Sequence, residues 1–240
     1  MSFQKLGPQA SVVSSRYLPP VERGLEFFNL FIHGAAGIAR NLVRDKPQPS
    51  LTGSPTYGSG YARFSPAAFL DSLLDDFPQF TFFAVCRGVG VTTDPATRPI
   101  FMGDYGGSTV ALGGTSLFVK TSVAISGIIN TNDGGSSVFV EAAITRDPNA
   151  WGMPCVTFDG TTLTTRDLAR PDIAPVSAAI THSRAFNAAT TRIGAGYSAS
   201  FGGTCDLHAA GICSVALNPT EQAAWYARLK ASAGRRGIVI

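Results

Sequence analysis

Short apolar segments separated by glycine-rich turns dominate the chain. The apolar run at 80–87 is typical of a buried strand. The clearest turns are Asp133-Gly134-Gly135 and Asp159-Gly160. Further short strands are predicted at 41–43, 57–64, 99–103, 108–112, 116–120, 122–129, 137–145, 153–158, 176–182, 191–195 and 206–217. The apolar cluster at 27–32 fits either a buried strand or a helical turn. Regularly spaced short strands predict an antiparallel β-sandwich of the jelly-roll type.

One short internal helix is predicted at 66–77. Ser65 is a capping residue, Pro66 follows at the first helical position, and Pro78 ends the segment. The apolar residues between the prolines recur at helical spacing: Phe69, Leu70, Leu73, Leu74 and Phe77.

A second helix is predicted near the C-terminus. Asn218 caps it, Pro219 takes its first position, and Glu221 favours the positive end of the helix. Trp225 and Leu229 give it a packing face. Gly234 and Gly237 mark the region where it ends, and 238–240 are expected to add a last short strand.

Two regions are distinguished by their patterns. Residues 1–24 lack a helical period and contain Gly7-Pro8 and Leu18-Pro19-Pro20, which predicts an extended N-terminal arm. Such an arm is either a disordered leader or a segment ordered by a partner. Residues 25–240 show no convincing linker and are assigned to one domain.

Composition supports a turn-rich β protein. Of the 240 residues, 45% are hydrophobic and only 15% are charged, with 26 glycines. That charged fraction lies below the usual quarter. The formal net charge is only +3 and the basic residues form no strong cluster, so no nucleic-acid binding is expected. No apolar stretch reaches the length of a membrane span, and the first residues lack the apolar segment of a signal peptide.

The four cysteines match no zinc-binding spacing. Cys86 and Cys213 lie in apolar runs and are interpreted as buried hydrophobes, whereas Cys155 and Cys205 follow turn-forming residues. We expect four free thiols, consistent with assembly in the cytoplasm of a host cell.

The last fifty residues resemble a known family of folds. The pattern lies in 203–210 (GTCDLHAA) and 213–222 (CSVALNPTEQ), which are similar to the closing strand and helix of concanavalin A-like (laminin G-like) lectin folds. Four further segments resemble phage-encoded versions of that module: 225–229 (WYARL), 235–238 (RRGI), 40–43 (RNLV) and 53–58 (GSPTYG). The resemblance covers about residues 24–240 and implies a concanavalin A-like jelly roll in a phage or prophage virion protein.

Lectins of this family that bind sugar through calcium use carboxylates and Asn on adjacent loops, and no such set is assigned here. The loop candidates are Asp94, Asp104, Asn132 and Asp133, and a solvated turn residue is the favoured interpretation of each. Candidate glycan-binding residues are the aromatic side chains close to loops, since sugar sites combine aromatic platforms with polar groups. They are Tyr105, Trp151 and Tyr197, with packing at the core or its rim as the alternative for each.

Catalytic chemistry is not indicated. Hydrolases on this fold carry clustered carboxylates on one strand, and glycosidases need two carboxyls at the scissile bond. Glu141 stands alone in its strand, and the G-x-S-x-G elbow and the P-loop are both missing. His33, His182 and His208 are far apart in sequence and are interpreted as three separate structural residues; Asp206 and His208 share a strand face at which a local contact is possible. We expect no catalytic residue, metal or cofactor.

The sequence therefore predicts a non-enzymatic virion structural protein of a bacteriophage, a tail, collar or decoration component, whose lectin-like domain serves assembly or host-surface attachment. Its expected partners are other virion proteins, further copies of itself and possible cell-surface glycans. The alternatives are a glycan-active hydrolase and a free carbohydrate-binding module on the same fold.

Overall fold

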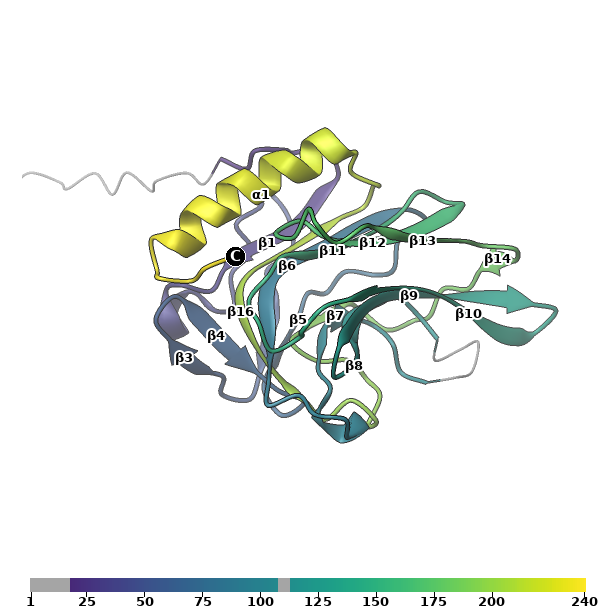
Figure 1. Ribbon diagram of the computed structural model, residues 1–240, viewed down its shortest axis with the longest axis horizontal. Helices are drawn as coiled ribbons and strands as arrows, with labels where there is room; N and C mark the ends of the chain where they lie inside the picture. The colour runs from purple at the N-terminus through teal and green to yellow at the C-terminus, as the bar shows by residue number, and fades with distance from the viewer. Residues whose placement is uncertain (1–17, 108–112) are drawn as a thin grey trace, which may run out of the picture.

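The computed structural model describes residues 18–107 and 113–240 and shows two antiparallel β-sheets packed face to face (Figure 1). The first, here sheet A, has the strand order β13-β12-β11-β6-β16-β4-β3, and β1 also pairs with β16. Its strands are β1 (Leu25–Leu30), β3 (Thr56–Gly58), β4 (Tyr61–Phe64), β6 (Phe80–Val89), β11 (Pro154–Phe158), β12 (Thr162–Asp167), β13 (Val176–Ala179) and β16 (Thr204–Cys213).

The second, here sheet B, has the order β10-β9-β8-β7-β15-β5-β2, and β14 also pairs with β9. Its strands are β2 (Ser50–Thr52), β5 (Phe69–Asp71), β7 (Ile100–Gly103), β8 (Ser116–Thr121), β9 (Ala124–Asp133), β10 (Ser136–Thr145), β14 (Ser183–Arg184) and β15 (Arg192–Ile193). Every pairing among the described strands is antiparallel, so the predicted antiparallel β-sandwich is confirmed.

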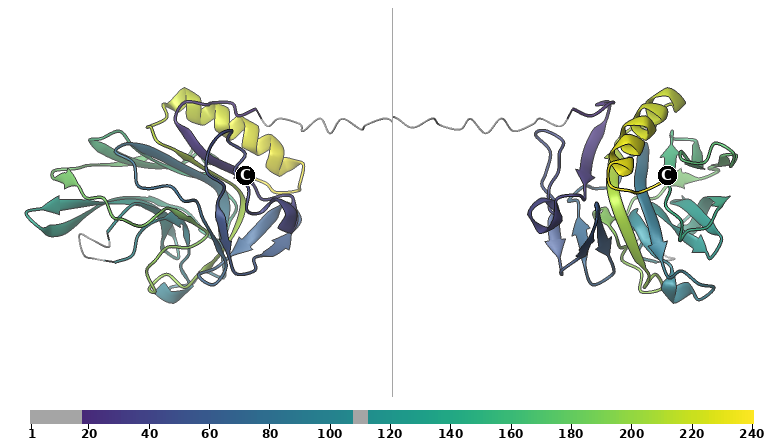
Figure 2. Two further views of the ribbon diagram at one scale, coloured as in Figure 1. Left: turned by 180° about the vertical axis from the view of Figure 1, so that it is seen from behind. Right: turned by 60° about the vertical axis from the view of Figure 1, so that its left-hand side comes forward.

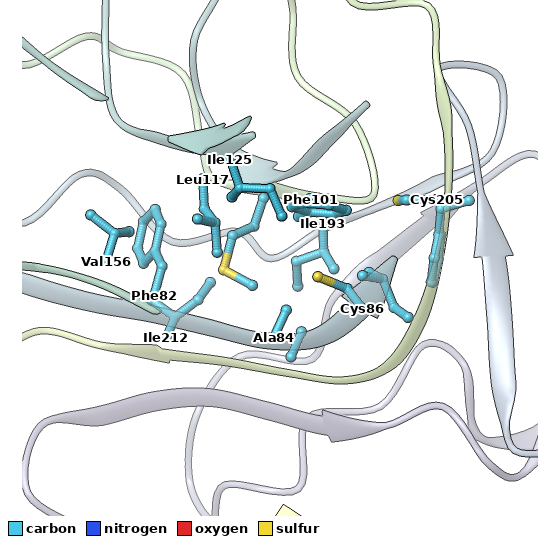
Figure 3. Packing of buried hydrophobic residues seen from close by; sticks show 14 of the residues in the cluster. Phe82, Ala84, Cys86, Phe101, Leu117, Ile125, Val156, Ile193, Cys205 and Ile212 are labelled. Atoms are coloured by element: carbon cyan, nitrogen blue, oxygen red, sulfur yellow. The ribbon is translucent and has the colours of Figure 1, made fainter. Parts of the chain in front are cut away.

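The main core fills the space between the sheets. Successive side chains of a strand point to opposite faces, so alternate residues of β6 face sheet B. Figure 3 shows Phe82 and Ala84 of β6 opposite Leu117 and Ile125 of sheet B. All four are at most 1% exposed. Burying one large apolar side chain contributes about 1.5–3 kcal/mol, so this layer is the main source of stability.

The one α-helix in the described part of the chain, α1 (Pro219–Gly234), packs on the outer face of sheet A. Asn218 caps its start, as predicted, and the Glu221 side chain accepts from the Asn218 backbone N–H, so that the two residues form a reciprocal capping box. Trp225 is fully buried, and its ring centroid lies 4.8 Å from those of Phe28 and Phe83. The predicted helix and the packing of Trp225 on the sandwich are therefore confirmed.

The predicted internal helix at 66–77 is wrong. Leu70 pairs with both Leu51 and Ile193 in sheet B, so this part of the segment is a strand. Leu73 has φ +59°, a left-handed conformation that ends regular structure, and its backbone N–H donates to the Asp71 carboxylate. The apolar residues of this segment recur at helical spacing because the strand β5 and the turn after it both contribute side chains to the core. The other helices among the described residues are two 3₁₀ turns, η1 (Gly34–Gly37) and η2 (Pro95–Thr97).

Three predicted strands also differ. Residues 57–64 form a hairpin, β3 and β4, that turns at Ser59-Gly60, where Gly60 has φ +84°. No strand forms at 41–43, because the Asn41 side chain accepts from Phe28 N and donates to Glu26 O along the outer edge of β1. Residues 238–240 are not a strand, and the Val239 side chain is left in solvent. The cluster at 27–32 is a strand, β1, and 108–112 lie outside the described residues.

All four cysteines are buried single thiols. Cys155 and Cys205 are each the second residue of a strand, β11 and β16, so both lie close to the loops that lead into those strands, as expected. Burial raises the pKa of the Cys155 thiol to about 12. No helix among the described residues is long and apolar enough to cross a membrane.

Candidate functional site

A groove of about 360 Å³ crosses the outer face of sheet B. Its floor follows from strand alternation: Leu117 and Val119 of β8 enter the core, so Phe118 and Lys120 point to the opposite face. Across the sheet, Ser116 of β8, Ile128 of β9 and Glu141 of β10 are direct neighbours. The remaining lining residues are Arg98, Ile100, Tyr105, Thr121 and Phe201.

Aromatic rings form one wall of the groove. The Phe201 ring packs edge-on against Phe118, with centroids 5.3 Å apart, and against Tyr105 at 5.9 Å. Tyr105 also meets Phe139 of β10 edge-on at 5.6 Å. Partial burial raises the pKa of the Tyr105 hydroxyl, which therefore stays protonated around neutral pH and can donate a hydrogen bond. Mutual packing holds these rings in place without a ligand.

The polar part of the groove contains groups with spare hydrogen-bonding capacity. Lys120 Nζ donates to Glu141 Oε2 at 2.8 Å. The other carboxylate oxygen, Glu141 Oε1, is buried and has no hydrogen-bond partner among the described residues, and the same holds for Arg98 Nε. A buried acceptor and a buried donor of this kind are costly unless something pairs with them. Both residues line the groove, so a side-chain movement that exposes either atom lets a ligand hydroxyl pair with it.

The three predicted binding residues separate into two places. Tyr105 lines the groove. Tyr197 is next to the groove but does not line it. The Tyr197 backbone N–H donates to Tyr105 O at 3.0 Å, and the Tyr197 ring centroid lies 3.5 Å from the Arg192 guanidinium carbon. Trp151 is on the other side of the sandwich, packed edge-on against Tyr61. The other nine residues that line the groove were not predicted as ligand contacts, among them Arg98, Phe118, Lys120, Glu141 and Phe201.

The four loop candidates for calcium do not form one site. Asp94 caps the 3₁₀ turn η2, and Asn132 and Asp133 are exposed in the hairpin between β9 and β10. These three fit the interpretation as solvated turn residues. For Asp104 that interpretation is wrong, because its side chain is buried and accepts from the backbone N–H of Thr115 at 2.5 Å.

Asp104 belongs to a buried charge cluster with Asp76 and Arg184. Arg184 donates to Asp76 and to the Thr115 hydroxyl, and the guanidinium lies 5.0 Å from the ring of Phe80. Burial, together with the nearby Asp76 carboxylate, raises the pKa of Asp104 to about 8. Burial also raises the pKa of Asp76. This cluster brings two carboxyls together, but both are covered, so no substrate bond can reach them.

The three histidines are separate. His33 is exposed, His182 lies 3.6 Å from Asp133, and His208 is fully buried. His208 Nδ1 contacts Gly60 O at 2.6 Å and its Nε2 contacts the Ser232 hydroxyl, while Asp206 binds two arginines. Among residues 18–107 and 113–240, no three His, Cys, Asp or Glu side chains are grouped to hold a metal.

A larger hollow, about 1110 Å³, lies beside the edge of β1 between the N-terminal segment and the loop at 40–48. Long charged side chains surround it, including Arg40, Lys46 and Arg228. It lacks the aromatic wall and the unpaired buried groups of the groove on sheet B, which is therefore the better candidate.

Comparison with known proteins supports the fold and leaves the ligand open. No protein-family model and no curated protein sequence matches the chain. Solved structures do match: the binding domain of botulinum neurotoxin DC in complex with SialylT, at 8% identity and a TM-score of 0.61, covers 86% of this chain and 52% of that one. The serotype D ligand-binding domain in complex with N-acetylneuraminic acid has 8% identity and a TM-score of 0.63, and covers 85% and 51%.

The binding domain of Paraclostridial Mosquitocidal Protein 1 is similar as well, at 11% identity and a TM-score of 0.60, with 85% of this chain and 51% of that chain covered. This chain spans about half the length of these neighbours. At such low identity the likeness establishes the β-sandwich fold alone. The ligands named for those proteins do not transfer with the fold.

Proposed function

We propose that this protein is a non-catalytic glycan-binding domain and that its ligand lies in the groove on the outer face of sheet B. The observation that carries the proposal is the buried, unpaired Glu141 Oε1 next to the Lys120 ammonium, facing a wall of packed aromatic rings. Sugar hydroxyls both donate and accept hydrogen bonds, and the apolar face of a sugar packs on aromatic rings. Two of the similar structures are named as complexes with SialylT or N-acetylneuraminic acid, which supports the same class of ligand.

A glycan array with the purified protein tests this proposal, followed by titration calorimetry on the glycans that bind. Phe201→Ala removes part of the aromatic wall, and Glu141→Gln replaces the unpaired acceptor. We expect each to weaken binding at least tenfold. Tyr57→Ala is the control, because Tyr57 is a 41% exposed aromatic on β3 of the other sheet. Binding that is unchanged in both groove variants, or a protein that binds no glycan, would contradict the proposal.

The hydrolase alternative requires a second carboxyl beside Glu141, and no described residue lining the groove supplies one. Purified protein should therefore release no reducing sugar from the glycans it binds. Turnover that disappears in Glu141→Gln would establish catalysis and contradict the binding-only proposal.

We further propose that the domain is carried on a phage virion as an attachment or assembly component. The support is the resemblance of 225–229, 235–238, 40–43 and 53–58 to phage-encoded versions of the concanavalin A-like module. Labelling purified particles with antibody and locating the label by electron microscopy tests this. A host-facing position favours attachment, an internal position favours assembly, and particles free of the protein would refute the virion role.

A further inference from the structure

We propose that the outer face of sheet A carries a second ligand site, formed by Arg63, Arg87, Tyr61 and Trp151, which binds a carboxylate-bearing sugar of an acidic glycan. This site lies on the opposite sheet from the groove and does not depend on it. Its starting point is the register of three strands: Asp206 of β16 lies directly between Arg63 of β4 and Arg87 of β6.

One carboxylate serves two guanidinium groups at this position. Arg63 donates through Nε to Asp206 Oδ1 at 2.7 Å and through Nη2 to Oδ2 at 3.1 Å, and Arg87 Nε donates to Oδ2 at 2.9 Å. Asp206 is fully buried beneath them, whereas the arginine side chains are 38% and 32% exposed. The three groups therefore carry a net charge of +1 on their solvent side.

Spare donors remain on both arginines. A guanidinium carries five N–H groups, and Nη1 of Arg63 and of Arg87 has no hydrogen-bond partner among the described residues. The two side chains converge on one carboxylate from strands on either side of β16. A second carboxylate, brought by a ligand, can therefore accept from both of them on the open side.

Aromatic rings hold Arg87 in this orientation. Its guanidinium carbon lies 5.1 Å from the Trp151 ring centroid and 5.9 Å from that of Tyr61. An arginine fixed by ring contacts and a buried ion pair has little side-chain entropy to lose when it binds an anion. Arg63 and Arg87 thus form a preorganised pair of donors beside two partly exposed aromatic rings.

Local backbone constraints position the two rings. Gly58 leaves room for Tyr61, because a Cβ at Gly58 would lie 2.1 Å from the Tyr61 ring. Gly152 pairs with Cys86 in an isolated bridge, which places Trp151 next to Arg87, and a Cβ at Gly152 would lie 2.0 Å from Arg146 Nη1. The ring positions are therefore fixed by the hairpin and by the chain entering β11.

This chemistry selects the ligand. Paired guanidinium groups favour a planar carboxylate, and aromatic rings beside them favour a sugar ring over a chain of phosphates. A uronic or sialic acid unit combines both properties in one residue. Arg235 and Arg236 lie near this face, since the Arg236 side chain contacts Gly60 in the turn before Tyr61, and they add positive charge at its margin.

The test is binding of polygalacturonate, measured by biolayer interferometry at physiological salt. The neutral comparison is the methyl-esterified form of the same polymer, and duplex DNA is the polyanion without sugar carboxylates. We expect the esterified polymer and DNA to bind at least tenfold more weakly than polygalacturonate. Equal binding of DNA would show simple attraction between charges and would overturn the proposal.

Variants locate the site. Arg87→Gln leaves Asp206 paired with Arg63, and Arg63→Gln leaves it paired with Arg87, so each retains a partner for the buried carboxylate. We expect each of these, Arg87→Lys and Trp151→Ala to weaken binding at least tenfold. Arg44→Gln removes the same charge from an exposed side chain and should change binding less than twofold. An equal loss in Arg44→Gln, or no loss in Arg87→Gln and Arg63→Gln, would overturn the site.

The groove variants separate the two proposals. Phe201→Ala and Glu141→Gln should leave polygalacturonate binding unchanged if the site on sheet A acts on its own. If they abolish it while Arg87→Gln has no effect, the acidic glycan occupies the groove and the second site is refuted, although the proposed function stands.

Discussion

The guanidinium of Arg184 donates to the carboxylate of Asp76 at a margin of the core, where only 6% and 2% of the two side chains are exposed. Phe80 and Phe158 pack beside the guanidinium, at 5.0 and 5.4 Å from its central carbon. Removing one member of a buried pair leaves the other charge uncompensated, which typically costs about 3–5 kcal/mol. Arg184→Met should lower the free energy of unfolding by about that amount in urea denaturation.

The double variant Asp76→Asn/Arg184→Met is the matched control. It removes both charges, so it should be more stable than Arg184→Met alone. If the single and double variants were equally destabilised, the loss would come from packing around the phenylalanine rings and the ion-pair explanation would be wrong.

Asp104 should make stability fall as the pH rises. Its pKa is raised to about 8 in the folded protein, by burial and by Asp76, against about 3.9 in an unfolded chain. Between these values the folded state holds one more proton than the unfolded state, so its contribution is fully present below about pH 4 and is lost as the pH approaches 8. Asp104→Asn carries no titrating proton. The urea midpoint of the wild type should therefore fall relative to that of Asp104→Asn as the pH rises from 5 to 8. A difference that stays constant over that interval would contradict the prediction.

Trp225 should contribute strongly to stability through its contacts with Phe28 and Phe83. Replacing a buried tryptophan by alanine typically costs about 3–5 kcal/mol, and Trp225→Ala should show a loss of that size in denaturant titration. Tyr226, the next residue on α1, is only partly buried and lies near Lys230. Tyr226→Ala should cost clearly less; an equal cost in both variants would mean that the helix contributes mainly through its backbone.

The N-terminal arm, 1–24, is predicted either to contact another copy of the chain or another virion protein, or to fold back on its own domain. Residues 1–17 lie outside the described part, and Arg23, near the end of the predicted arm, is bonded to Glu221 at 2.7 Å. Deleting 2–17 should therefore leave the melting temperature unchanged, because Arg23 and its contacts stay, while it weakens self-association or entry into particles. Light scattering with thermal melts measures both. A truncated protein that unfolds, or one that associates like the full chain, would argue against an intermolecular arm.

The sequence predicted those elements whose signals are local. Strand alternation and glycine turns predicted most of the sandwich, and Asn218 followed by Pro219 predicted the start of α1. The 66–77 segment failed because its apolar spacing fits a helix equally well, and only its backbone conformation distinguishes the two. The left-handed conformation of Leu73, with φ +59°, could not be predicted from the sequence, since that geometry is usual for glycine rather than leucine.

The groove could not be predicted because its residues come from segments far apart in the chain, from Arg98 to Phe201. One local signal was present: Phe118 stands between the core residues Leu117 and Val119, so it must point away from the core. An aromatic residue on the outer face of a strand indicates either that another segment of the chain covers it or that it belongs to a binding site. Asp104 was misjudged for the same reason, since its burial depends on partners at Asp76 and Arg184.

Both ends of the described chain lie on the same side of the molecule. Val21 and Ile240 each pack on the cluster between α1 and sheet A, and Figure 2 shows the first described residues and the C-terminus beside the helix. The groove opens on sheet B, across the full thickness of the sandwich. A reporter fused after Ile240 would therefore emerge away from the groove, and the molecule immobilised through that fusion would present the groove outward.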